Sequence, residues 1–372
     1  MSFPEEPLDL SPTSGGPGYF AATIHQKLNN DKYEIIRKLG YGPRSSTWLI
    51  WREYDDVYFS VKIYTVAASE HAKEVELSIL QSVKRLDPNL PLSRLQDSFW
   101  EKGYHGSHFC IVTNPLSTTV EDLRLEEEAQ RLPVHVVQRI VYSAALALEG
   151  LHSAGIMHGA VNAGNVYFST PTQAESLRPQ LESEDEPSST KIGNFDTVTS
   201  QPIKHSLRGW RHKKAIVSEW PLYLANLGHA QQSTFKPEPT GDYVSAPETL
   251  SQNASCSPQT DIWQLGCLVQ LYHFSCDKPL QTLKLLTGSN PPFISEADTP
   301  SRLAAIHAAI DDEDTKSIES ALSGALHKDD VAAAAAFIKD CLRVDPSKRL
   351  TVKETLRHGW LSKANVCSCG YC

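Results

Sequence analysis

Hydrophobic side chains recur at every second residue in the first third of the chain and at every third or fourth residue in most of the rest. The stretches 33–42, 48–54 and 57–65 alternate hydrophobic and polar residues or are rich in β-branched and aromatic ones, which predicts three short strands. Residues 68–83 have helical spacing, and 108–113 again have the composition of a strand. The pattern therefore predicts a small, mainly β unit that contains one helix.

Helical spacing dominates the later part of the chain. Residues 134–153 place apolar side chains on one face of a predicted helix, and similar runs begin near Asp261 and cover 301–310 and 330–342. Between them, residues 170–221 have the character of an insertion, because an acidic, Pro/Ser-rich stretch and a basic stretch interrupt the periodic pattern. The predicted fold class is α+β, with a small β-rich lobe followed by a larger helical lobe.

The charge balance argues against a general nucleic-acid binder. The chain has 372 residues, with 35 Lys and Arg against 44 Asp and Glu, and a net charge of −9. Nothing here supplies a broad basic face to neutralise phosphates, and no apolar run approaches the roughly 18 residues of a membrane span. We therefore expect an intracellular protein with no membrane segment and no direct nucleic-acid contact. Disorder is expected in the Pro/Ser/Gly-rich residues 1–18 and fraying in the Cys-rich tail at 365–372.

Two closely spaced glycines and a lysine suggest a site for phosphate groups. Gly40 and Gly42 follow one predicted strand and precede another, and glycine lets backbone amides approach a phosphate closely. Lys62 lies 22 residues after Gly40, in an otherwise hydrophobic strand where an unpaired charge is costly. Glu76 on the following helix is the candidate partner. Taken singly, these features also fit a hairpin turn and a surface lysine.

Three later segments complete a recognisable order: Ser245-Ala-Pro-Glu248, Asp261-Ile-Trp-Gln-Leu-Gly266 and Cys341-Leu-Arg-Val-Asp-Pro-Ser-Lys-Arg349. Together with the features above they resemble the motifs of a protein kinase, and the glycine-containing loop is similar to that of SR-protein kinases, particularly fungal ones. The resemblance runs from about Tyr19 to Leu361. It implies a two-lobed protein kinase fold over 19–364, with an N-lobe at about 31–114 and a C-lobe at about 118–364.

The resemblance also implies roles for individual residues. Thr113 takes the gatekeeper position, and Asn114 to Leu116 fall where the hinge of a kinase contacts adenine. The implied nucleotide-binding residues are Gly40, Gly42, Lys62, Glu76, Thr113, Asn114 and Leu116. The implied structural residues are His158, Glu248, Asp261 and Arg349, of which the last pairs with Glu248.

The catalytic motif departs from the family pattern. A kinase catalytic loop reads His-Arg-Asp-x-x-x-x-Asn, in which the Asp accepts the proton of the substrate hydroxyl and the Asn helps to hold a second Mg²⁺. SR-protein kinases also carry a Lys two residues after the Asp. His158 and Asn165 are retained here, but Ala160 stands in place of the catalytic Asp and Asn162 in place of the Lys. The methyl group of Ala160 cannot accept a proton.

The Mg²⁺-binding aspartate is replaced as well. Asn194 lies 54 residues before Glu248 and Asn226 lies 22 before it, and both stand in segments similar to the family's metal-binding motif. The shorter spacing suits an activation segment, and Leu-Ala-Asn226-Leu-Gly resembles the Ala-Asp-Leu-Gly of SR-protein kinases, so Asn226 is preferred. Either alignment puts a neutral amide where Mg²⁺ favours a carboxylate.

These losses predict a pseudokinase, a serine/threonine kinase-like scaffold or allosteric binding module with little or no phosphotransfer. Lys62 and Glu76 leave ATP binding open, with Mg²⁺ bound weakly or not at all. The alternative is an active kinase for Arg/Ser-rich proteins that borrows a carboxylate from 182–186 or from Asp196. A decaying paralogue is a third interpretation. The expected partners are proteins, either Arg/Ser-rich ones or an active kinase, in the cytoplasm or the nucleus.

Regulation by phosphorylation is expected to be weak. The usual Arg before the catalytic Asp pairs with a phosphorylated activation loop. Gly159 stands at that position and has no side chain for this pairing. Phosphorylation of Ser233, Thr234 or Tyr243 is therefore expected to have little regulatory effect.

Overall fold

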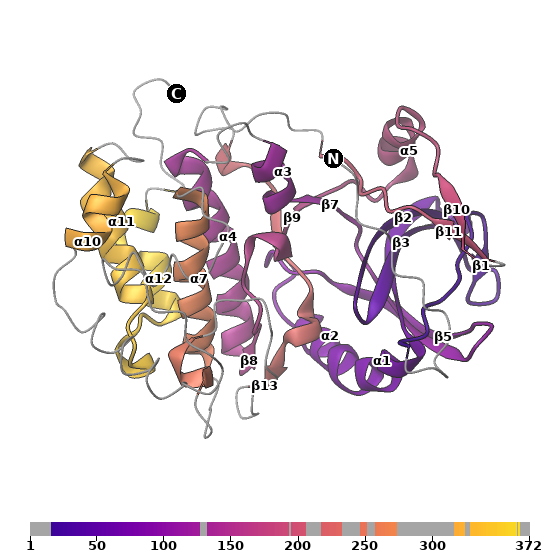
Figure 1. Cartoon of the computed structure of the whole chain (residues 1–372), viewed down its shortest axis with the longest axis horizontal. Helices are drawn as coiled ribbons and strands as arrows, with labels where there is room; N and C mark the ends of the chain where they lie inside the picture. The colour runs from indigo at the N-terminus through magenta and orange to yellow at the C-terminus, as the bar shows by residue number, and fades with distance from the viewer. Residues whose placement is uncertain are drawn as a thin grey trace. The chain divides into compact units, whose positions relative to one another are not determined.

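The chain folds into two compact units, seen in a computed structural model (Figure 1). Unit 1 contains Met1–Pro88, Ser93–Thr118 and Phe168–Ser206, and unit 2 contains Asn89–Leu92, Thr119–Tyr167 and Leu207–Cys372. The structure describes residues 16–126, 132–192, 195–205, 217–232, 246–250, 257–273, 316–323, 328–362 and 364. Each unit is described by itself below.

Unit 1 is built on an antiparallel six-stranded sheet with the strand order β1-β2-β3-β4-β6-β5. Its strands are β1 (Lys27–Leu28), β2 (Tyr33–Gly42), β3 (Ser45–Arg52), β4 (Val57–Tyr64), β5 (Leu95–Lys102) and β6 (Ser107–Thr113). The strands predicted at 33–42, 48–54, 57–65 and 108–113 are thus confirmed. β1 and β5 were not predicted, because neither segment has a clear alternating pattern.

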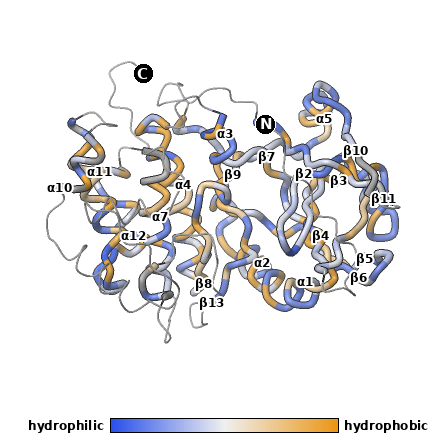
Figure 2. The backbone as a smooth tube through the Cα atoms, in the orientation of Figure 1, coloured by the Kyte–Doolittle hydropathy of each residue, from blue (hydrophilic) through white to orange (hydrophobic). Residues whose placement is uncertain are grey.

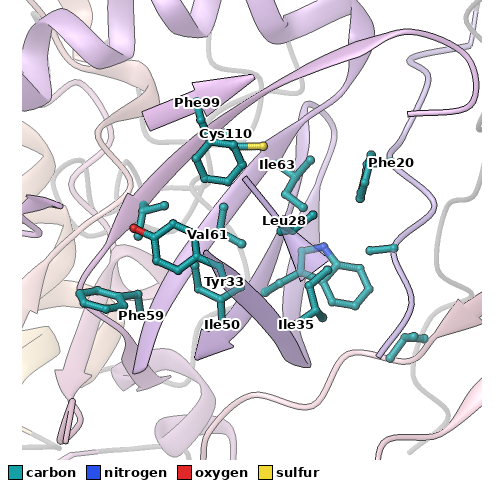
Figure 3. Close-up of a cluster of buried hydrophobic side chains, with 14 residues drawn as sticks. Phe20, Leu28, Tyr33, Ile35, Ile50, Phe59, Val61, Ile63, Phe99 and Cys110 are labelled. Atoms are coloured by element: carbon teal, nitrogen blue, oxygen red, sulfur yellow. The ribbon is translucent and has the colours of Figure 1, made fainter. Parts of the chain in front are cut away.

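One face of this sheet carries a continuous hydrophobic core. Alternation along β2, β3 and β4 places residues such as Tyr33, Ile50 and Val61 on that face, and Phe20 from the preceding segment lies against it (Figure 3). Tyr33 contributes a ring contact to each of two neighbours, edge-on to Phe59 and stacked on Phe99. The N-terminal segment around Phe20 therefore folds as part of unit 1.

The helix of unit 1 is continuous but changes its winding. It begins as α1 (Val66–His71), passes through a π-helical turn at Ala72–Glu76, and continues as α2 (Leu77–Val83). The side chain of Thr65 accepts a hydrogen bond from the Ala68 amide and caps its start. Ile79 and Val83 are buried, so the predicted helix and its apolar face are confirmed.

The insertion is divided between the two units. Its first part forms α5 (Ala174–Glu182) and a hairpin of β10 (Ser189–Ile192) and β11 (Phe195–Val198), and this part folds with the sheet of unit 1 (Figure 1). The remainder, from Leu207, is assigned to unit 2. Unit 1 therefore consists of three separate stretches of chain.

Unit 2 is mainly helical. Its described α-helices are α3 (Val120–Glu126), α4 (Val134–Ser153), α7 (Pro258–His273), α10 (Lys316–Leu322), α11 (Lys328–Cys341), α12 (Val352–Arg357) and α13 (Gly359–Ser362). Hydrophobic residues recur along α4 and α7 (Figure 2). α7 approaches α11 closely at Gly266, where an added Cβ would lie 2.7 Å from the Cβ of Cys341. The helices predicted at 134–153, from Asp261 and at 330–342 are confirmed.

Short strands and 3-10 turns connect these helices and carry the candidate site. They are β7 (Leu116–Thr119), β8 (Ile156–Met157), β9 (Val166–Ser169), β12 (Leu222–Leu224) and β13 (Gln231–Gln232), with 3-10 turns at Ala163–Asn165, Leu227–His229 and Pro247–Leu250. In unit 2, β8 pairs with β13 in antiparallel fashion.

Several predicted features lie outside the described residues. They are the tails at 1–15 and 365–372, the helix at 301–310, the alternative metal-site residue Asn194, the phosphosites Ser233, Thr234 and Tyr243, and Ser245. Of the N-terminal tail, Pro17 and Gly18 are described, and their carbonyls accept backbone hydrogen bonds from Ala67 and Val66. None of the helices in the described part of the chain is both long and apolar enough to cross a membrane.

Candidate functional site

Strand register in unit 1 places two of the predicted nucleotide-binding residues, Gly40 and Lys62, in one row across the sheet. Gly40 of β2 pairs with Thr47 of β3, Thr47 pairs with Lys62 of β4, and Lys62 pairs with Ile111 of β6. Residues directly opposite each other in an antiparallel pair point to the same face. Gly40 and the Lys62 side chain therefore share a face, opposite to the one that carries the core around Val61.

Lys62 forms the expected ion pair with Glu76. The Lys62 ammonium lies 3.0 Å from one carboxylate oxygen of Glu76 and 3.2 Å from the other. Only 9% of the Glu76 side chain is exposed, so removal of either partner would leave a charge with little access to water. Glu76 is the last residue of the π-helical turn in this helix. Next to the pair, burial and the Glu76 charge raise the pKa of Tyr64 well above its usual range.

Gly40 and Gly42 lie in a tight hairpin. Gly42 pairs with Ser45 across the turn between β2 and β3, and the Gly42 carbonyl accepts a hydrogen bond of 2.7 Å from the Tyr19 hydroxyl. A Cβ added at Gly40 or Gly42 would meet no atom within 4 Å. Contacts inside unit 1 therefore do not account for the glycines at these positions, and the space beside them is open.

Ser60 was not singled out from the sequence, yet it controls the hydrogen bonds of the predicted hinge. Its hydroxyl lies 2.9 Å from the hydroxyl of Thr113 and donates to the carbonyl of Asn114 at 3.2 Å. The side-chain carbonyl of Asn114 accepts from Gln96 at 3.0 Å. Ser60 stands two residues before Lys62 on the same strand face, and this spacing was the only signal that could have found it. Leu116 begins β7.

In unit 2, Asp261 organises the loop that holds the predicted catalytic residues. Its carboxylate accepts hydrogen bonds of 2.8 Å from the backbone amides of His158 and Gly159, and lies 2.9 Å from His152. Asp261 is completely buried. Gln264, one turn later on α7, accepts from the Val161 amide and donates to the Gly159 carbonyl. The first turns of α7 therefore fix the backbone of residues 158–161.

His158 is buried and neutral in its setting. Its Nδ1 accepts from the Ala160 amide at 3.2 Å, so its Nε2 carries the proton and donates to the Ala225 carbonyl at 3.1 Å. Burial lowers the pKa of His158 below its ordinary value. Gly159 has φ of +77°, and an added Cβ would lie 2.7 Å from the carbonyl oxygen of His229. Any residue with a side chain would be strained at this position.

Ala160 brings no reactive group to this loop. Its methyl group is fully buried. Its carbonyl accepts hydrogen bonds from the side-chain amides of Asn162, at 3.1 Å, and Asn165, at 2.8 Å. The loop therefore has an ordered hydrogen-bond network, and none of its residues 158–165 carries a carboxylate.

Asn226 lies beside Asn165 and pairs with it. The Asn226 amide donates to Asn165 Oδ1 at 3.1 Å, and the Ala225 amide donates to the Asn165 carbonyl at 2.9 Å. Asn226 adopts the left-handed conformation, with φ of +63°, which asparagine tolerates better than most residues. Ile192 and Phe195 of the competing segment instead lie in the β10–β11 hairpin of unit 1.

This pair of asparagines does not fit magnesium. Mg²⁺ is held mainly by carboxylate oxygens and phosphates, whereas Asn165 and Asn226 offer neutral amides. Asn165 Oδ1 already accepts a hydrogen bond from the Asn226 side chain. Over the described ranges, no group of three or more His, Cys, Asp and Glu side chains could hold a metal ion. The donor set beside Asn165 therefore provides no charge to balance that of Mg²⁺.

Glu248 and Arg349 form a buried bidentate pair in unit 2. Each oxygen of Glu248 accepts from the Arg349 guanidinium at 2.6 Å. Arg349 also donates to the carbonyls of Gln259, Arg343 and Val344, and its guanidinium lies 4.9 Å from the centre of the Trp263 ring. This pairing is the one implied by the sequence, and it ties the 3-10 turn at Pro247–Leu250 to the C-terminal helices.

Comparison with solved structures identifies the fold. A crystal structure of a kinase domain superposes with a TM-score of 0.59 at 17% identity, covering 92% of this chain and 98% of that one. The chain has a protein kinase fold. Unit 1 is its β-rich N-lobe and unit 2 its helical C-lobe, and a model of the protein kinase domain matches residues 222–361.

Comparison with curated proteins finds similar kinases. A serine/threonine protein kinase of Aspergillus fumigatus is 29% identical over 242 residues, 64% of this chain and 56% of that protein. A serine/threonine-protein kinase SRPK of Physarum polycephalum is 22% identical over 93% of this chain and 89% of its own length. SRSF protein kinase 3 of Mus musculus is 30% identical over 157 residues, 40% of this chain and 27% of that protein. The matched region thus spans about half of the Aspergillus protein.

Proposed function

We propose that this protein is a pseudokinase of the SR-protein kinase type, which acts as a protein-binding scaffold or allosteric partner. The observation that carries the proposal is the hydrogen bond between Asn226 and Asn165, because it joins two neutral amides where metal-assisted phosphotransfer needs a negative charge. Ala160 adds to the argument, since its methyl group cannot accept the proton of a substrate hydroxyl. The hydrogen bonds of Asp261 and the ion pair of Arg349 are present, so the fold of unit 2 can be stable in a protein that does not transfer phosphate.

Nucleotide binding without metal is part of the proposal for unit 1. The Lys62–Glu76 pair supplies an ammonium on the sheet face that also carries Gly40, and the space next to Gly40 and Gly42 is open. Such an arrangement favours phosphate oxygens, which can accept hydrogen bonds from both the ammonium and backbone amides. ATP is the proposed ligand of unit 1. The proposed Mg²⁺ binding is weak or absent, because Asn165 and Asn226 offer neutral amides where a hard cation favours carboxylates.

The proposed partners are proteins, either Arg/Ser-rich chains or an active kinase. SRSF protein kinase 3 is named for such a substrate class, and its likeness to this chain supports the first partner. The net charge of −9 also favours a basic partner over nucleic acid. The competing proposal is an active kinase that borrows a carboxylate from 182–186 or from Asp196. Glu184 is a poor candidate for this role, since it already forms an ion pair with Arg37 inside unit 1.

Phosphotransfer from labelled ATP to an Arg/Ser-repeat peptide tests the proposal, with Mg²⁺ or Mn²⁺ and with Lys62→Ala protein purified in parallel. We expect no signal above background in either protein. Transfer by the wild type that disappears in Lys62→Ala would overturn the pseudokinase assignment. Equal transfer by both proteins would identify a contaminating kinase, which repeated purification would remove. Retention of the protein on an Arg/Ser-repeat peptide column supports the scaffold role, and failure to bind this peptide removes the first partner class.

A further inference from the structure

A second row of residues lies beside the Lys62 row on the same face of the sheet. Arg37 pairs with Leu49, Leu49 with Ser60, and Ser60 with Thr113, from β2 across to β6. Because Ser60 and Lys62 are two residues apart on β4, both rows face the same way. The half of this second row at Ser60 and Thr113 leads to the predicted hinge. The other half, at Arg37 and Leu49, lies next to Gly40.

The insertion covers the Arg37–Leu49 half of this row. Leu177 and Leu181 of α5, together with Ile203, form a buried hydrophobic cluster with Leu49 and Tyr58. Leu39, which directly precedes Gly40, packs against the edge of the same cluster. The face that carries Lys62 is therefore bounded on one side by residues of the insertion, which the sequence pattern placed outside the lobe.

A buried ion pair holds the end of α5 on this face. The Arg37 guanidinium donates to Glu184, and it also donates to the Leu181 carbonyl at 3.5 Å. The Arg37 and Glu184 side chains are only 4% and 12% exposed. Nε of Arg37 and Oε1 of Glu184 are both buried, and neither has a hydrogen-bond partner among the described residues. A buried pair that is only partly satisfied depends strongly on both of its charges.

Backbone hydrogen bonds attach the insertion at two further places. The Tyr58 amide donates to the Thr172 carbonyl at 2.7 Å, just before α5. The Gln201 amide donates to the Lys38 carbonyl at 2.7 Å, on the strand that leads into Gly40. Release of the Arg37–Glu184 pair would therefore free the C-terminal end of α5 while both flanking attachments hold the segment to the sheet.

We propose that α5 and Ile203 determine the ligand specificity of unit 1. In their packed position they narrow the face beside Lys62 and limit the room for the base and sugar of a nucleotide, while the phosphate-binding end at Gly40, Gly42 and Lys62 stays open. Inorganic tripolyphosphate, which has no base or sugar, should therefore bind to this face with an affinity close to that of ATP. The inference rests on the proposed nucleotide binding of unit 1. Glu184 acts as a positioning residue, because it touches Arg37 and not the ligand.

The test compares the affinities of metal-free ATP and inorganic tripolyphosphate by calorimetry. Glu184→Gln leaves the buried Arg37 charge unpaired and should release α5. If α5 is packed about nine-tenths of the time in the wild type, the ratio of the ATP affinity to the tripolyphosphate affinity should rise about tenfold. The exchanged pair Arg37→Glu with Glu184→Arg should restore the wild-type ratio. Glu182→Gln, an exposed carboxylate at the end of the same helix, is the matched control. Hydrogen exchange of the α5 amides, measured in each variant without ligand, reports the release directly.

The results distinguish three claims: that the ion pair holds α5, that α5 shapes the ligand face, and that unit 1 binds nucleotide. Faster exchange in α5 together with a higher ATP-to-tripolyphosphate ratio in Glu184→Gln, both reversed in the exchanged pair, would support the proposal. Faster exchange with an unchanged ratio would show that α5 does not shape the ligand face. Unchanged exchange would show that the ion pair does not hold α5. If neither ligand binds to any variant, the nucleotide-binding part of the proposed function fails, and the inference fails with it.

Discussion

Asn226 donates its side-chain amide to Asn165 Oδ1 at 3.1 Å, and Asn165 in turn donates to the Ala160 carbonyl at 2.8 Å. The three residues form a chain of neutral hydrogen bonds. Asn226 has a left-handed backbone and its side chain reaches Asn165, so the three residues offer hydrogen bonds and no charge.

Replacement of Asn226 by Asp should restore a response to Mg²⁺. A carboxylate beside Asn165 Oδ1 supplies the charge that a hard cation favours. We expect Asn226→Asp to bind Mg²⁺ at least about tenfold more tightly than the wild type, which corresponds to about 1.4 kcal/mol. Calorimetric titration of each protein with Mg²⁺ measures the difference. Asn162→Asp adds the same charge elsewhere in the loop, and an equal response in that control would show that the effect is not local.

Removal of the Ser60 hydroxyl should strengthen ATP binding. The hydroxyl donates to the Asn114 carbonyl, which the resemblance places in contact with adenine. Because a neutral hydrogen bond contributes about 0.5–1.5 kcal/mol, Ser60→Ala should tighten ATP binding roughly two- to tenfold. Ser117→Ala removes another buried hydroxyl, one that donates to the Phe168 carbonyl, and should leave the affinity unchanged. Weaker binding by Ser60→Ala would mean that the hydroxyl supports the ligand.

Asp261→Asn should destabilise the C-lobe strongly. An amide has one acceptor oxygen, so it cannot serve the His158 amide, the Gly159 amide and His152 together. The loss of charged hydrogen bonds at a fully buried position should cost about 3 kcal/mol. Asp345→Asn, which alters an exposed cap on Ser347, should cost less than about 1 kcal/mol. Urea unfolding of both variants gives the comparison, and equal losses would contradict the role given to Asp261.

Stability should fall as the pH drops below about 6.5, the ordinary pKa of histidine in the unfolded chain. Burial lowers the pKa of His205, which stacks on Phe168, to about 4, and it also lowers that of His158. The folded state therefore binds fewer protons than the unfolded state between pH 4 and 6.5, and acid favours unfolding. Melting temperatures at pH 7.5 and 5.0 should differ less in His205→Phe than in the wild type. An equal difference would show that His205 does not contribute.

The sequence predicted the fold well where periodicity was strong and local. The bounds of α4 match the predicted helix at both ends, because Pro133 precedes its first residue and its buried face recurs without interruption. The ion pair of Lys62 with Glu76 could also be predicted, since a cation in a hydrophobic strand needs a nearby anion. Spacing to Glu248 favoured Asn226 over Asn194, and this choice stays a prediction because Asn194 lies outside the described residues.

Features that depend on long-range register could not be predicted. Ser60 is an ordinary strand residue until the pairing of β4 with β6 brings it to Thr113. Glu184 stood in an acidic stretch typical of a solvated loop, yet it is buried against Arg37, 147 residues away. Composition describes such a segment correctly on average and gives no information about the single carboxylate that folds inward.

The division of the N-lobe into three stretches of chain sets an order for its folding during synthesis. β2, β3 and β4 leave the ribosome early, but the residues that cover Leu49 and Tyr58 end at Ile203, after the whole of α4 has been made. At typical elongation rates this delay is on the order of ten seconds. During that time the newly made sheet presents an uncovered apolar face to chaperones and to other nascent chains. Fragments that stop before Ile203 should therefore aggregate even though they contain every strand of the main sheet.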